Sequence, residues 1–334
     1  MARVVIFGAG GFIGIPLCEE LVRRGHEVTA VDKWYFEKYP SVGNIVRMDI
    51  RDLGDLALSP DWSVIDLAGL SNDATAEIDP SLTVAINGDG ARHLAYVAKK
   101  AGVRRYIYSS SASVYGHGNK MYLTENDEVA PLTEYAKSKV GVEKYLNLLA
   151  GEDFEPVILR NATVFGVAPR MRFDLAINVM TMRAWKDKRI LIMGGGRQMR
   201  PFVHVSDVVR VFCEMLERPA DQVAGKTFNV GSDVMNFSIS QIAGLIKQQF
   251  RDAEIISVPD DTDLRTYHLS FKKLRDIGIE CNFGIEAGIK EVRDALDAGT
   301  INADDPTTIT LKWYQELMAW EKRLANIRLD GRIL

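Results

Sequence analysis

Short apolar runs rich in β-branched residues alternate along the chain with longer stretches of helical pattern. The short runs predict strands, and the longer stretches predict helices. We expect strands near residues 3–7, 27–31, 45–48, 63–67, 105–110, 156–160 and 227–230. We expect helices near residues 13–24, 81–101, 134–150, 174–187, 206–217, 239–250, 286–298 and 307–325. This alternation favours an α/β fold, in which a mostly parallel sheet carries helices on both faces.

A glycine-rich segment, residues 8–14, follows the first expected strand and opens into the first expected helix. Gly8 permits a tight turn, Gly11 lets the backbone approach a pyrophosphate, and Gly14 lets the helix pack closely on the strand. The amides at the helix N-terminus are donors for the anion. The segment therefore predicts a Rossmann-type dinucleotide site.

A carboxylate ends the second expected strand. Asp32 lies eighteen residues after Gly14, where an acid accepts hydrogen bonds from the hydroxyls of the adenosine ribose. Because a 2′-phosphate would meet this negative charge, Asp32 favours NAD over NADP, although the neighbouring Lys33 leaves NADP open. The alternative is that Asp32 is only a solvated residue at a strand end.

Tyr135 and Lys139 lie four residues apart on the helix expected at 134–150. Such residues share a helix face about 6 Å apart, so the ammonium can lie beside the phenol. The pKa of a free tyrosine is near ~10, and a lysine cation and an oxidised nicotinamide would both lower it towards the operating pH. The pair indicates acid/base chemistry on an alcohol, but any exposed helix can carry the same spacing, so the rest of the chain decides.

The chain as a whole resembles the extended short-chain dehydrogenase/reductase superfamily, and most closely its nucleotide-sugar epimerase and dehydratase branch. The resemblance extends to about residue 300. It is carried by Gly8, Gly11, Gly14, Asp32, Asp49-Ile50, Leu67-Ala68-Gly69, Asn87, the serine strand 105–111 with Val114-Tyr115-Gly116, Tyr135, Lys139, and the stretches 159–166 and 200–208.

The resemblance implies a Rossmann-type doubly wound parallel sheet with a smaller C-terminal substrate-binding lobe. The NAD-binding domain would span 1–167 and be completed by about 202–232. The lobe would comprise 168–201 and 233–334, lying over the carboxyl ends of the strands, where ligands bind in such sheets.

The resemblance also implies the roles of single residues. Ser111, Tyr135 and Lys139 would be catalytic, with Ser111 hydrogen-bonding the reacting sugar oxygen, whereas Ser109 and Ser110 would be structural. NAD would contact Gly8, Gly11, Phe12, Ile13, Gly14, Asp32, Lys33, Asp49, Ile50, Leu67, Ala68, Gly69, Tyr135 and Lys139. The nucleotide-sugar substrate would contact Ser71, Ser113, Thr163, Arg170, Arg172, Arg200 and Arg265.

Arginines dominate the expected substrate site, because their planar forks suit phosphate. Arg200 falls at the family position that contacts the diphosphate. Arg170 and Arg172 add anion contacts or, equally, belong to a solvated or salt-bridged loop. His204 is expected to be structural.

The first chemical step implied is oxidation of a sugar hydroxyl, most often at C4, by Tyr135 and NAD. An epimerase, which returns the hydride to the other face, fits best. A 4,6-dehydratase is disfavoured because Ala112 and Ser113 stand where such relatives have an acidic residue.

Residues 163–174 are similar to those of bacterial GDP-heptose 4-dehydrogenases, which keeps a dehydrogenase as the alternative. A non-catalytic NAD-binding sensor is less favoured still. Thr163 in place of asparagine, and Pro201 in place of aspartate, leave the sugar nucleotide open.

The composition excludes several other classes. The 334 residues carry a formal charge of −4, with basic residues scattered, which disfavours nucleic-acid binding. Cys18, Cys213 and Cys281 suit buried thiols, and the histidines do not cluster, so we expect no metal. We expect no signal peptide or membrane span, and therefore a cytoplasmic protein.

The resemblance implies a homodimer through the helices at 81–101 and 134–150. The alternative is that the apolar faces of these helices only cover the sheet.

Overall fold

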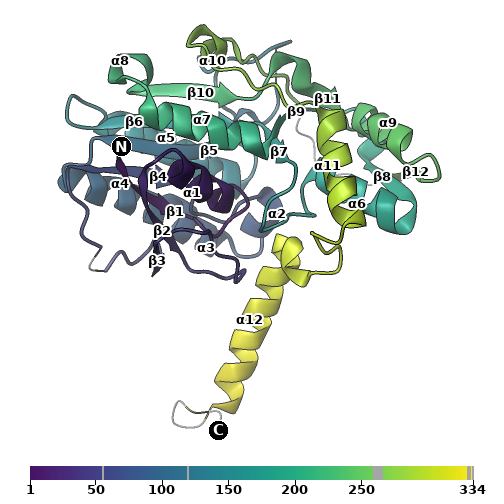
Figure 1. The fold of residues 1–334 in the computed structure, drawn as a ribbon, viewed down its shortest axis with the longest axis horizontal. Coiled ribbons are helices and arrows are strands. Elements are labelled where there is room, and N and C mark those ends of the chain that lie inside the picture. The colour runs from purple at the N-terminus through teal and green to yellow at the C-terminus, as the bar shows by residue number, and fades with distance from the viewer. Residues whose placement is uncertain (55, 119, 259–265, 329–331, 333–334) are drawn as a thin grey trace.

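The computed structural model describes residues 1–54, 56–118, 120–258, 266–328 and 332. Its centre is a seven-stranded parallel sheet with the strand order β10-β6-β5-β4-β1-β2-β3 (Figure 1). The strands are β1 (Arg3–Phe7), β2 (Glu27–Asp32), β3 (Asn44–Arg47), β4 (Trp62–Asp66), β5 (Arg105–Ser111), β6 (Glu155–Asn161) and β10 (Lys226–Val230). All seven predicted strands are confirmed to within one residue at each end.

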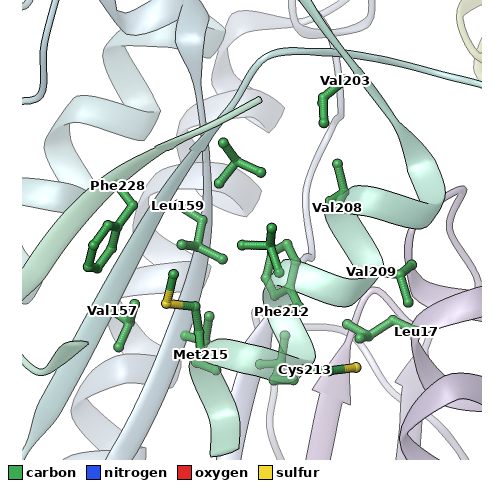
Figure 2. Close-up of a cluster of buried hydrophobic side chains, with 14 of the residues drawn as sticks. Leu17, Val157, Leu159, Val203, Val208, Val209, Phe212, Cys213, Met215 and Phe228 are labelled. Carbon is green, nitrogen blue, oxygen red and sulfur yellow. The ribbon is translucent and has the colours of Figure 1, made fainter. Parts of the chain in front are cut away.

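Helices cover both faces of this sheet because its strands are apolar on both faces. Val4 and Ile6 of β1 pack with α1 (Gly14–Arg23) and α7 (Val205–Glu217) on one side. The alternate residues Val5 and Phe7 pack with α4 (Ala91–Lys100) and α5 (Glu134–Leu149) on the other. Figure 2 shows the first of these layers, in which Phe212 and Met215 of α7 lie over Leu159 of β6. The predicted doubly wound α/β fold is therefore confirmed.

The helix predicted at 81–101 is interrupted by a π-helical segment. It consists of α3 (Pro80–Thr83), the π-helix η1 (Val84–Gly90) and α4. Asn87 lies in η1, where its amide accepts a hydrogen bond from the backbone N–H of Leu70 (2.7 Å) and donates one to the carbonyl of Leu70 (3.0 Å). These bonds hold Asn87 against the loop that follows β4, and π-helical turns of this kind are frequent at functional sites.

A smaller layer lies beyond the carboxyl ends of the sheet. Its strands form the sheets β11-β9-β7 and β12-β8, and its three main helices share one core. The elements are β7 (Thr163–Phe165), α6 (Ala176–Asp187), β8 (Arg189–Met193), β9 (Met199–His204), β11 (Asn236–Ser238), α9 (Ile239–Gln249), β12 (Glu254–Val258) and α11 (Ile285–Asp297). The prediction missed all five strands.

The remaining elements are short, apart from the last helix. They are α2 (Asp73–Ala76), α8 (Ala220–Val223), α10 (Lys272–Asp276) and the 3₁₀ turns η2 (Ala112–Tyr115), η3 (Gly194–Gly196), η4 (Asp233–Met235) and η5 (Pro306–Thr308). Leu269, Phe271 and Leu274 pack into the core beside β10, so this part of the chain after residue 233 contributes to the first core. The domain boundaries stay a prediction.

The last helix, α12 (Thr310–Ile327), projects away from the body of the molecule (Figure 1). Thr310 is its one buried residue. The predicted helices other than 81–101 agree with α1, α5, α6, α7, α9, α11 and α12 to within three residues at each end.

Candidate active site

A cavity of about 590 Å³ lies at the carboxyl ends of β1, β2, β4, β5 and β6 and is closed from the other side by the smaller layer. Every predicted site residue that the structure describes contributes to its wall. These residues are Gly8, Gly11, Phe12, Ile13, Gly14, Asp32, Lys33, Asp49, Ile50, Leu67, Ala68, Gly69, Ser71, Ser111, Ser113, Tyr135, Lys139, Thr163, Arg170, Arg172 and Arg200. Arg265 lies outside the described residues.

The glycine turn fits a dinucleotide pyrophosphate. Gly8 has φ +81°, and a Cβ there would lie 2.7 Å from the carbonyl carbon of Leu67. A Cβ on Gly14 would lie 2.3 Å from the carbonyl oxygen of Gly8. The helix α1 that starts at Gly14 has no side-chain cap and no acidic residue in its first turn. Its first amides are therefore available to an anion in the cavity.

Asp32 is held rigidly at the far end of this turn. Its two carboxylate oxygens accept hydrogen bonds from the amides of Gly10 (3.0 Å) and Trp34 (2.9 Å). Burial raises the pKa of Asp32. The ammonium of Lys33 is 2.8 Å from Asp49, so it is engaged by another carboxylate. This arrangement suits the free ribose hydroxyls of NAD rather than the 2′-phosphate of NADP.

Tyr135, Lys139 and Ser111 come together at the centre of the cavity. Tyr135 lies in the first turn of α5, which Thr133 caps by accepting a hydrogen bond from the Ala136 amide (3.2 Å). Lys139 donates to the carbonyl of Ser109 (2.8 Å), and its ammonium is 5.7 Å from the Tyr135 ring centroid. The Ser111 hydroxyl lies close enough to the Tyr135 phenol to lower its pKa by hydrogen bonding. The three side chains form one cluster in the wall of the cavity.

In the protein alone, Lys139 does not bring the pKa of Tyr135 below its ordinary value, and the joint effect expected of Lys139 and an oxidised nicotinamide stays a prediction. Burial raises the pKa of Tyr135 to about 12, with Asp73 acting in the same direction, and the hydrogen bond from Ser111 only partly opposes this. Burial also lowers the pKa of Lys139 to about 8. The sequence pattern gave the spacing of the pair but not its enclosure, which dominates both pKa values.

Asp66, the last residue of β4, is a buried carboxylate near the cluster that the sequence analysis missed. Its carboxylate is fully buried and accepts hydrogen bonds from the hydroxyl of Tyr106 (2.9 Å) and the amide of Ala68 (3.1 Å). Burial raises the pKa of Asp66 to about 6. Its negative charge in turn favours the ammonium form of Lys139 against the burial of that lysine.

The serine strand separates into two kinds of hydroxyl. Ser111 accepts hydrogen bonds from the hydroxyl (3.0 Å) and the amide (3.2 Å) of Ser113. Ser110 donates to Glu143, and Ser109 accepts from Asn161 (3.0 Å). Ser109 and Ser110 are thus tied into the framework, whereas Ser111 keeps its own proton for a partner in the cavity.

Arg170 and Arg172 both line the cavity but have different surroundings. Arg172 makes two hydrogen bonds to Asp174 (2.9 and 3.0 Å), which is the salt-bridged alternative of the prediction. Arg170 is 3% exposed, stacks over Phe36 and donates to the hydroxyl of Thr310 (2.8 Å). Its Nε is buried without a hydrogen-bond partner among the described residues. Burial lowers the pKa of Arg170 to about 10, and the charge of Arg172 acts in the same direction.

Further cavity residues come from parts of the chain that no motif marked. Asn72 donates to Asp174 (2.8 Å), and Tyr314 of α12 reaches the wall beside Tyr35 and Phe36. These residues are brought together across up to 279 positions of sequence, from Tyr35 to Tyr314, so no local pattern indicates them.

The surroundings of the other candidate groups are structural. The imidazole of His204 lies between Ser206 and Glu291, 2.7 and 2.8 Å away, and stacks on Phe283. The three cysteines are free and buried. In the described part of the chain, no group of three or more His, Cys, Asp or Glu residues is placed to hold a metal ion. No described helix is both long and apolar enough to cross a bilayer.

The fold and the cavity define a dinucleotide-dependent enzyme. Residues 4–231 match the NAD dependent epimerase/dehydratase family. The UDP-N-acetyl-alpha-D-glucosaminuronate decarboxylase of Bacillus cytotoxicus is 30% identical over 332 residues, covering 94% of this chain and 98% of the relative. The UDP-glucose 4-epimerase of Mycolicibacterium smegmatis is 30% identical over 246 residues, covering 70% of this chain and 78% of the relative.

A solved structure, MoeE5 in complex with UDP-glucuronic acid and NAD, superimposes with a TM-score of 0.78 at 26% identity, covering 89% of this chain and 100% of that one. The chain therefore belongs to the NAD dependent epimerase/dehydratase family, of the extended short-chain dehydrogenase/reductase type. Its cofactor is NAD.

Proposed function

We propose that the protein is an NAD-dependent nucleotide-sugar epimerase that oxidises one sugar hydroxyl, at C4, and returns the hydride to the opposite face of the ketosugar. The observation that carries the proposal is the cluster of Ser111, Tyr135 and Lys139 in the wall of the dinucleotide cavity. When bound, NAD accepts the hydride from the sugar carbon and gives it back.

The side chains of the cluster have distinct roles in this reaction. Tyr135 takes the proton of the sugar hydroxyl and later returns it. Ser111 donates a hydrogen bond that holds the reacting oxygen near the phenol. Lys139 is anchored on the Ser109 carbonyl by a 2.8 Å hydrogen bond, and its positive charge favours the phenolate.

An epimerase needs no acid/base group beyond this cluster, because the ketosugar only has to turn before the hydride returns. A 4,6-dehydratase must also remove the C5 proton and expel the C6 hydroxyl. The two residues after Ser111 are Ala112 and Ser113, neither of which is a carboxylate. The observation favours the epimerase over the dehydratase.

A nucleotide-sugar 4-dehydrogenase is the second candidate. It is favoured by residues 163–174, which place Arg170, Arg172 and Asp174 in the cavity and resemble the corresponding stretch of GDP-heptose dehydrogenases. Such an enzyme would release the ketosugar, and the reduced cofactor would then be reoxidised by another compound.

The substrate of either reaction is a nucleoside diphosphate sugar. We assign its diphosphate to Arg200, whose guanidinium lies in the cavity wall over Tyr267. Ser71, Ser113, Thr163 and the buried Arg170 are further candidates for substrate contacts.

The experiment that tests the function incubates the purified protein and NAD with UDP-, GDP-, CDP- and dTDP-sugars and follows NADH absorbance and product mass. A product of unchanged mass without net NADH supports the epimerase and names its nucleotide. A product lighter by two hydrogens, formed with NADH, replaces it by the dehydrogenase. A product lighter by one water would identify a dehydratase, and no turnover of any sugar would overturn the proposal.

We further propose that two copies associate through α4 and α5. These helices pack on each other and leave Val84, Tyr96 and Leu148 exposed on and beside them. Apolar side chains of this size on neighbouring elements suit an interface between subunits.

A further inference from the structure

The helix α12 touches the body of the molecule only near its first turns (Figure 1). The indole Nε1 of Trp313 donates to the carbonyl of Tyr35 (2.8 Å), and the ring of Tyr314 contacts Tyr35 and Phe36. The helix has 18 residues and so extends about 27 Å. Most of its length lies against no other described element.

Five apolar residues of α12 form a continuous seam. Trp313, Leu317, Trp320, Leu324 and Ile327 follow one another at alternating intervals of four and three residues. This is the spacing of a coiled coil, in which such a seam meets a partner helix. Trp320 is 46% exposed and Ile327 is 61% exposed, whereas Trp313, Leu317 and Leu324 are half-buried, so the C-terminal part of the seam is the least covered within a single chain.

We infer that this seam packs against the same seam of a second copy of the chain, with the two helices antiparallel. The charged residues that flank the seam favour a second copy as the partner and an antiparallel direction for the pair. Glu316 and Arg323, both exposed, flank the seam on the same side at the positions that face each other in antiparallel pairs. When the pair is centred between Met318 and Ala319, Glu316 of each copy faces Arg323 of the other.

The same register also matches the sizes of the seam residues. Trp320 of one copy meets Leu317 of the other, and Trp313 meets Leu324, so each large ring lies opposite a smaller side chain. The two helices then overlap along their whole length, because position 318.5 is the midpoint of Thr310–Ile327.

The other arrangements bring like charges together. A parallel pair places Glu316 against Glu321 and Arg323 against Arg328. Sliding the antiparallel pair by one heptad places Arg323 of one copy against Arg323 of the other. Like charges at such positions destabilise a helix pair.

The charges of α12 argue against a lipid surface as the occupant. Helices that lie on membranes are rich in lysine and arginine on the polar face. The polar positions of α12 carry both signs, with Lys312, Lys322 and Arg323 beside Glu316 and Glu321.

The test uses two charge variants of the full chain, Glu316→Arg and Arg323→Glu. Each turns two attractive pairs into repulsive ones and is expected to weaken the association about tenfold, so the particle mass measured by light scattering falls by half near the dissociation concentration. An equimolar mixture of the two variants is expected to recover the full mass, because opposite charges then face each other at both pairs of positions 316 and 323. Lys322→Glu, on the outer face, is the matched control and keeps the wild-type mass.

Three results would overturn the inference. A parallel pair predicts tighter association for Glu316→Arg, because that side chain would then face Glu321. Docking of α12 on another surface predicts that the mixture does not recover the mass. A partner of another kind, or a membrane, predicts that none of the variants changes the mass of the purified protein. Circular dichroism of each variant checks that the helix is kept.

Discussion

At the scale of single residues, enclosure moves the pKa values of the ionisable groups in the cavity away from their ordinary values. Burial raises the pKa of Tyr135 and lowers that of Lys139. Each group alone is thereby driven towards its neutral form. Their charged forms must be supported by neighbours, of which the hydroxyl of Ser111 and the carboxylate of Asp66 are in place in the protein.

We predict that Tyr135→Phe lowers kcat by roughly 10²–10⁴-fold, the usual contribution of an acid/base group. The affinity for NAD should stay close to that of the wild type, because the phenol is lost but the ring remains. Steady-state kinetics and a titration with NAD measure the two quantities. Unchanged turnover would support a role as a sensor instead.

We predict that Asp66→Asn moves the alkaline limb of the kcat/KM profile to lower pH. The ammonium of Lys139 exists below its pKa of about 8, and the charge of Asp66 raises that pKa against burial. Without this charge the pKa of Lys139 is lower, so Lys139 loses its proton at a lower pH.

The matched control is Tyr106→Phe, which removes a hydrogen bond to Asp66 but keeps the carboxylate. It should leave the alkaline limb in place. An Asp66→Asn profile that coincides with that of the wild type would show that Lys139 does not depend on this charge.

At the scale of elements, the π-helix η1 connects the fold to the site. Its Asn87 makes two hydrogen bonds to the backbone of Leu70, and a Cβ on Gly69 would lie 2.8 Å from the Asn87 amide oxygen. The loop that carries Leu67, Ala68 and Gly69 into the cavity is therefore fixed by Asn87, which comes from η1.

We predict that Asn87→Ala lowers the free energy of unfolding by about 1–3 kcal/mol, because it leaves partly buried polar groups of the Leu70 backbone without the side chain that pairs them. It should also weaken NAD binding, since the loop lines the cavity. Denaturant unfolding and NAD titration check both effects. Asn282→Ala, at an exposed position, is the control, and equal stability of the two variants would contradict the role of Asn87.

The sequence predicted the central sheet because its strands are continuous apolar runs between helices. The strands of the smaller layer were missed for specific reasons. Pro201 interrupts β9, a residue type that argues against a strand. β7 and β11 are three residues long, and most of β12 is exposed, so none of these three gives a clear periodicity.

The candidate site was predictable where residues lie at fixed spacings, as in the glycine turn and the Tyr135 and Lys139 pair. It was not predictable where distant segments meet. The negative charge of Asp66 on β4 raises the pKa of Lys139 on α5. Asn72 donates a hydrogen bond to Asp174, which lies 102 positions later in the sequence. Such contacts are decided by packing of the whole chain.

At the scale of the whole molecule, two separate surfaces are proposed to join copies of the chain. One is the pair α4 and α5 near the central sheet, and the other is the seam of α12. If both form and their two-fold axes intersect at right angles, four chains close into one particle, whereas other angles give larger or open assemblies.

We predict that Tyr96→Glu combined with Leu148→Glu halves the particle mass by disrupting the α4 and α5 surface. Charges on both sides of an apolar interface are desolvated and repel each other. Leu132→Glu is the matched control, since Leu132 is also exposed, at 47%, but lies outside both helices. A double variant with the wild-type mass would contradict the proposed dimer.

The position of Tyr314 has a consequence for biosynthesis. The chain leaves the ribosome from its N-terminus, so the glycine turn and Asp32 are available early, whereas the cavity wall between Phe36 and Arg170 is finished only when Tyr314 has emerged. More than 300 residues separate Gly8 from Tyr314. A nascent chain that has emerged only as far as the central sheet therefore has the glycine turn without the complete wall of the cavity.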